Sequence, residues 1–120
     1  MSKILVHITT DPEFKNKVTL GLGVALAALR NNHEVTLFLA ADGVHILNCK
    51  EMGVIVGQGT GDLREHLDNL KKTNANIFVS RLSAQARGYD DSLLEGYNAE
   101  FAMSDKLIEV SLEQDCVLCY

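Results

Sequence analysis

The chain has 120 residues, of which 47% are hydrophobic and 22% are charged. This composition predicts a single globular domain over residues 1–120, with a core that needs neither a disulfide nor a metal. The net charge of -5 and the absence of a Lys/Arg stripe argue against a nucleic-acid partner, because a phosphate backbone repels an acidic surface. No apolar run is long enough for a secretory signal or a membrane-spanning helix, so we expect a cytoplasmic protein without membrane attachment.

Short apolar runs alternate with longer segments of helical periodicity. Apolar residues at Val18, Leu22, Ala25 and Leu29 recur at steps of three and four, which predicts one buried helix face. In chain order, we expect a strand over 3–8, a helix over 18–29, a strand over 34–40, a short helix over 42–50, a strand over 53–56, a glycine-rich turn over 57–61, a surface helix over 62–72, a strand over 76–79, a turn over 80–88, helical segments over 92–97 and 103–114, and a strand over 116–120.

This alternation predicts an α/β fold with a mostly parallel, five-stranded sheet that helices cover on both faces. The continuous apolar run Val35–Leu39 suits a strand buried in that way. Ligands of open α/β sheets bind outside the carboxyl ends of the strands. We therefore expect a binding site among the loops over 9–14, 41–44 and 80–88.

The turn after the fourth expected strand has the chemistry to hold an anion. Backbone N–H groups there, with Arg81 and Arg87 nearby, could bind a small anionic ligand. Alternatively, Arg87 pairs with Asp90, Asp91 or another surface carboxylate. The predicted ligand-binding residues are Thr9, Thr10, Asp42, Gly43, Ser80, Ser83, Arg87 and Gly88.

The histidines and cysteines indicate neither a metal site nor a cofactor. The histidines lack metal-ligand spacing, and His7 is either a buried, hydrogen-bonded residue or a residue at the border of the crevice. Cys116 and Cys119 form a Cys-x-x-Cys on an expected strand, where residues three apart point to opposite faces and cannot form a disulfide. We expect these two cysteines and Cys49 to be reduced, buried, apolar fillers.

The order and spacing of several short segments resemble the DsrE/DsrF-like family of sulfur-relay proteins over nearly the whole chain. An apolar first strand leads to a Thr-rich loop with Asp11-Pro12-Glu13, and a final helix leads to a final strand. The other segments of the resemblance are Ala27-Ala28-Leu29, His33 to Leu39, Asp42-Gly43-Val44, Ala86-Arg87-Gly88, Leu94-Glu95-Gly96 and Gln114-Asp115.

The resemblance implies a three-layer α/β/α fold, a cytoplasmic location, and homo- or hetero-oligomers, often trimers or hexamers. It also implies that active members carry sulfur as a persulfide on a cysteine just after the fourth strand. Some members have a Cys-x-x-Cys before Ala-Arg-Gly, and the resemblance places Ser80 and Ser83 at those two cysteine positions. A serine hydroxyl cannot form a persulfide and is far less acidic than a thiol.

Three functions follow as hypotheses. The first is a non-catalytic accessory or ligand-binding subunit of an oligomer, with the family's fold and without its cysteine. The second is a sulfur carrier that uses Cys49, Cys116 or Cys119 instead. The third is an anion- or small-ligand-binding module at the crevice.

Overall fold

Five short parallel strands form the central sheet of the computed structural model, which describes residues 1–120, in the order β6-β5-β2-β1-β7. Their bounds are β1 (Lys3–Ile8), β2 (Glu34–Leu39), β5 (Asn76–Ser80), β6 (Ala99–Ala102) and β7 (Cys116–Cys119). Around them lie α1 (Lys15–Arg30), α2 (Leu63–Lys71), α3 (Arg81–Ala86), α4 (Ser104–Leu112), the 3-10 segments η1 (Ala41–Glu51) and η2 (Asp91–Leu94), and the hairpin strands β3 (Val56–Gly57) and β4 (Gly61–Asp62).

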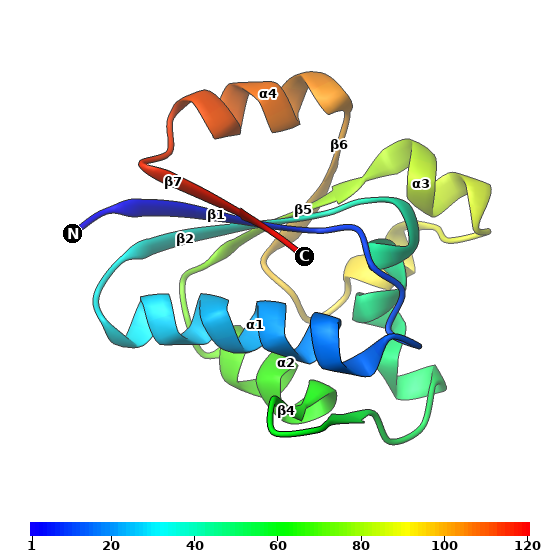
Figure 1. Ribbon diagram of the computed structural model, residues 1–120. Helices are drawn as coiled ribbons and strands as arrows, with labels where there is room; N and C mark the ends of the chain where they lie inside the picture. Colours follow the sequence, from blue (N-terminus) through cyan, green and yellow to red (C-terminus); the bar gives the residue numbers. More distant parts are fainter.

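The helices make three layers with the sheet (Figure 1). Helices α1 and α2 cover one face, and α4 alone lies over the other. This arrangement confirms the predicted α/β class and parallel sheet. No helix has the length and apolar composition needed to cross a membrane.

The core divides between the two faces because side chains alternate along each strand. The larger cluster, with Val6, Ile8 and Leu37, packs against α1 and α2. A smaller cluster of Leu5, Phe38 and Val110 lies beneath α4. With α4 as its only helix, this face leaves Val117 of β7, the register partner of Leu5, 43% exposed.

One predicted strand is wrong and one strand was missed. Gly53 to Val56 does not join the central sheet; only Val56 is extended, in the hairpin of β3 with β4, and Val54 is 86% exposed. The fifth strand of the sheet is β6, which pairs with β5 at the edge. Its sequence Ala-Glu-Phe-Ala is short and weakly apolar, so tertiary pairing rather than local pattern makes it a strand.

Other predicted elements differ mainly at their limits. The segment 92–97 is helical only as the short η2, and the turn over 80–88 contains the helix α3. The predicted end of the first helix is confirmed, since α1 ends at Arg30 and Asn32 adopts a left-handed φ of 65°.

His7 lies on the α4 face, edge-on to Phe38, with ring centroids 5.8 Å apart. Its Nε2 atom is buried without a hydrogen-bond partner, so the expectation of a hydrogen-bonded histidine is wrong for this nitrogen. Burial lowers the pKa of His7 from its ordinary value of 6.5.

The free energy of unfolding should therefore fall as the pH drops through this region. The unfolded chain protonates His7 near pH 6.5, whereas the folded chain does so only at a lower pH. The stabilisation from neutral His7 is fully present above pH 6.5, the ordinary pKa of the unfolded chain. It is lost as the pH falls toward the lower pKa of His7 in the folded chain. Urea unfolding across this range should show the loss in the wild type and a shallower loss in His7→Leu. An unchanged slope in His7→Leu would contradict the assignment.

Candidate functional site

Three loops meet at the carboxyl ends of β1, β2 and β5. They are the segment after Ile8, the start of η1, and the turn that enters α3. The Ala41 N–H donates to Ser83 Oγ at 2.9 Å, and Arg87 donates from Nε and Nη2 to Asp42 Oδ1 at 3.2 and 3.0 Å. These hydrogen bonds connect the start of η1 to the turn that enters α3.

The two serines at this edge have structural hydrogen bonds. Ser80 is the N-cap of α3, and its Oγ accepts from the Ser83 N–H at 3.2 Å. Ser83 Oγ in turn accepts from Ala41, which has a strained left-handed φ of 50°. Both hydroxyls therefore act as acceptors that hold the backbone of the loops.

The arginines of the turn are already engaged. Arg87 forms an ion pair with Asp42 and also donates from Nη1 to the Ser83 carbonyl at 3.0 Å. The Arg81 guanidinium lies over the Phe101 ring, 5.2 Å from its centroid. This arrangement matches the alternative in which Arg87 pairs with a carboxylate, and it leaves little unpaired positive charge for an anion.

Gly43 is buried and has a packing role. A Cβ atom at this position would overlap the carbonyl oxygen of Ile8 and come within 3.3 Å of Thr9 Cα. Only glycine therefore lets η1 approach the end of β1 this closely. The contact also sets where Asp42 lies relative to the loop after β1.

The remaining predicted residues lie around this edge with fewer contacts. Thr9 is exposed, and its N–H donates to the Tyr120 carbonyl at 3.0 Å. Thr10 is half-buried in the same loop. Gly88 follows α3 with a left-handed φ of 81° and stays exposed. The structure thus joins Asp42, Ser80, Ser83 and Arg87 through direct bonds, with the other four on the flanks.

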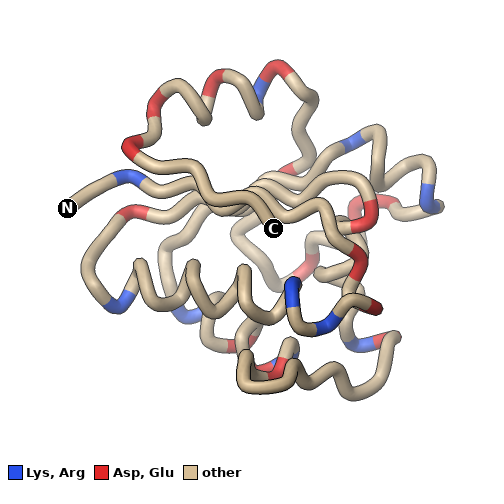
Figure 2. Tube along the Cα trace, in the orientation of Figure 1, with Lys and Arg blue, Asp and Glu red and all other residues tan.

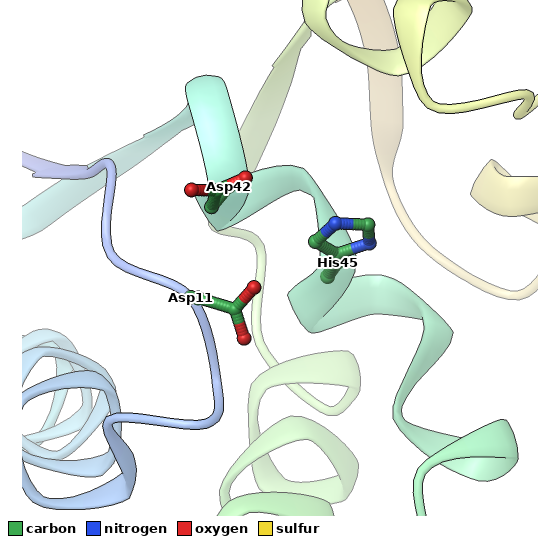
Figure 3. Close-up of side chains that lie close together, drawn as sticks. All are labelled: Asp11, Asp42 and His45. Carbon is green, nitrogen blue, oxygen red and sulfur yellow. The ribbon is translucent and has the colours of Figure 1, made fainter.

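Sequence reasoning missed a second set of side chains at this edge. Asp11, Asp42 and His45 point toward a common space (Figure 3), and one ligand atom from each lies within 4.8 Å of the others. Asp42 and His45 are three residues apart in a 3-10 segment, where such side chains eclipse. That spacing on the expected short helix over 42–50 was the available signal, but nothing in the local sequence places Asp11 beside it.

The expectation that all three cysteines are buried is wrong for two of them. Cys49 is buried at 6% exposure, whereas Cys116 and Cys119 are exposed. Both lie on β7, an edge strand, so neither side of that strand is fully covered. All three thiols are free, as expected. Cys119 pairs in register with His7.

Two cavities lie near this edge rather than in it. One, of about 540 Å³, is open and has Arg81, Tyr89 and Asp90 in its wall. Another, of about 370 Å³, contains Cys49 and Tyr97, and burial raises the pKa of Tyr97 to about 12. Neither cavity includes the predicted ligand-binding residues.

Comparison with known proteins identifies the class to which this architecture and edge belong. The family model of the DsrE/DsrF-like family matches residues 2–120, and the chain therefore belongs to that family, which is related to sulfur relay. The crystal structure of the YchN protein from E. coli is similar in fold, with a TM-score of 0.76, 21% sequence identity and 100% coverage of both chains. Comparison with curated proteins gives no significant match.

Proposed function

We propose that this DsrE/DsrF-like protein is a non-catalytic accessory or ligand-binding subunit of a cytoplasmic oligomer. One observation carries the proposal: Ser80 and Ser83 stand where the family resemblance places the sulfur-carrying cysteines. Their hydroxyls cap α3 and hold the Ala41 N–H. Neither hydroxyl can carry sulfane sulfur. Both accept backbone hydrogen bonds, which is a structural role that requires no sulfur transfer.

The exposed apolar surface supports assembly with further subunits. On α4, Ile108 is 62% exposed and Leu112 is 82% exposed, and the two share one helix face because they are four residues apart. Val117 of the neighbouring β7 is 43% exposed. A second copy of this chain, packed on α4, would remove these side chains from water.

The size of the particle in solution tests the accessory-subunit proposal. Light scattering after size exclusion should give the mass of a closed oligomer for the wild type. The double variant Ile108→Lys/Leu112→Lys should dissociate, because each lysine would place a charge in an apolar interface. Leu82→Lys, which changes a leucine that is 60% exposed on α3, is the matched control and should keep the oligomer. A wild-type monomer that takes up no related subunit would contradict the proposal.

A second function, a sulfur carrier with a relocated thiol, is favoured by the exposure of Cys116 and Cys119. The imidazole of His7 occupies the register position beside Cys119 on the neighbouring strand. Native labelling with a thiol reagent should modify both exposed cysteines and spare Cys49, which is 6% exposed. Labelling establishes access only, whereas sulfur loading from a cysteine desulfurase separates the two functions.

A further inference from the structure

Three metal-ligating side chains meet at the carboxyl edge of the sheet although they come from separate parts of the chain. Asp11 lies in the loop after β1, and Asp42 and His45 project from the start of η1 (Figure 3). One ligand atom from each lies within 4.8 Å of the other two. A carboxylate–carboxylate–imidazole set of this kind suits zinc and other divalent transition metals.

Each of the three side chains has one polar atom that forms a hydrogen bond and a second polar atom that forms none. Asp11 Oδ1 accepts the Glu13 N–H at 2.8 Å, and Asp42 Oδ1 accepts both bonds from Arg87. Their Oδ2 atoms make no hydrogen bond within the protein. The held oxygens fix the carboxylates, and the free oxygens remain available to a ligand.

His45 is oriented in the same way by Tyr89. Its Nδ1 lies 2.6 Å from the Tyr89 hydroxyl, and the two rings pack edge to face. If Nδ1–H donates to this oxygen, Nε2 carries the lone pair that a metal requires. Metal-ligating histidines commonly have such a partner on the other ring nitrogen.

The charge at this edge favours a cation over an anion. Asp11 and Asp42 contribute two negative charges, and the Arg87 guanidinium offsets one of them. Acidic and basic segments both appear around this end of the sheet in Figure 2. A divalent ion would find one net negative charge, an imidazole nitrogen and open solvent for a further ligand.

We propose that Asp11, Asp42 and His45 bind a divalent transition-metal ion, through Asp11 Oδ2, Asp42 Oδ2 and His45 Nε2. Tetrahedral zinc with bonds near 2.1 Å needs ligand atoms about 3.4 Å apart, so a pair at the full separation of 4.8 Å must close by about 1.4 Å. Asp11 can make this movement because it lies in a loop and is only half-buried. The fourth position faces solvent and is open to water or to a ligand of the subunit.

This inference deepens the ligand-binding part of the proposed function and is tested without sulfur chemistry. Calorimetric titration of the full chain with Zn²⁺ should show saturable binding of one ion. Asp11→Asn and His45→Gln should each weaken binding by more than about 100-fold, and Tyr89→Phe, which alters only the orienting bond, by about 10-fold. Asp42→Asn is less informative because it also frees Arg87.

Two controls distinguish this site from other zinc ligands. Asp91→Asn removes an exposed carboxylate of η2 and should leave the affinity unchanged. Co²⁺ in place of Zn²⁺ should give a spectrum without thiolate charge-transfer bands, which would reveal ligation by Cys116 or Cys119. The proposal is overturned if no saturable binding occurs, if Asp11→Asn and His45→Gln bind like the wild type, or if thiolate bands appear. A failure to bind metal would not change the results expected from light scattering or from sulfur loading, so the two proposals fail independently.

Discussion

Gly43→Ala should lower the free energy of unfolding by about 3 kcal/mol, at the upper end of the range for overpacked sites. The added methyl group would overlap the Ile8 carbonyl oxygen, which belongs to the sheet backbone and cannot rotate away. That carbonyl also accepts from the Ala40 N–H at 3.1 Å, so relief of the overlap would strain the hydrogen bond between β1 and the loop after β2. Urea unfolding measures the loss, and the Tm should fall by more than roughly 10 °C.

Gly23→Ala is the matched control for this substitution. Gly23 lies inside α1 with helical geometry, and a Cβ there would meet the His66 ring at 3.6 Å and the Thr60 carbonyl oxygen at 4.0 Å, both ordinary contacts. Alanine favours a helix interior over glycine, so this variant should be stabilised by up to about 1 kcal/mol. Equal stability of Gly43→Ala and Gly23→Ala would show that the approach of η1 to β1 is not as close as the structure indicates.

Ser80→Cys should give the protein a thiol that accepts sulfur, at a position where the family resemblance places a cysteine. The position caps α3, where backbone N–H groups stabilise a thiolate. That thiolate would attack the sulfane sulfur of a desulfurase persulfide, release the desulfurase thiolate, and retain the sulfur as a new persulfide. Intact-protein mass spectrometry should then show a gain of about 32 Da that reductant removes.

Ser104→Cys supplies the comparison for a thiol at a helix start. Ser104 is exposed at the first position of α4, two residues after Ala102, the register partner of Ser80 on β6. We expect less loading there, because the family resemblance places its cysteine at position 80 and none at position 104. Equal loading of the two variants would mean that position 80 has no special capacity for sulfur. Ser80→Cys should also lose about 1 kcal/mol of stability, since sulfur is a weaker cap acceptor than oxygen.

The fold was predictable because its signals are local and repeated. The apolar run at Val35–Leu39 and the helical spacing from Val18 to Leu29 each fix an element, and their alternation implies a parallel sheet. The edge strand β6 was not predictable in this way, because Ala99–Ala102 is extended only through its pairing with β5. Local pattern also misled at Val54, an apolar residue that the fold leaves 86% exposed.

The meeting of two of the expected loops was predictable, but the bonds between them were not. The rule for carboxyl ends of strands pointed to the loops over 41–44 and 80–88, which Asp42, Ser83 and Arg87 join. It could not show that Arg87 pairs with Asp42, since 45 residues separate them and several carboxylates were equally eligible. Exposure of Cys116 and Cys119 depended likewise on the position of β7 at an edge, which sheet order decides and local sequence does not.

Sulfur loading of the wild-type protein tests the proposed non-catalytic role most directly. The protein is incubated with a cysteine desulfurase and cysteine, and its intact mass is measured before and after reduction, with Ser80→Cys as the loading control. The account predicts an unchanged wild-type mass beside an adduct of about 32 Da on the variant. A wild-type adduct that reductant removes, and that Cys116→Ser or Cys119→Ser abolishes, would contradict the account and make the protein a sulfur carrier with its thiol on β7.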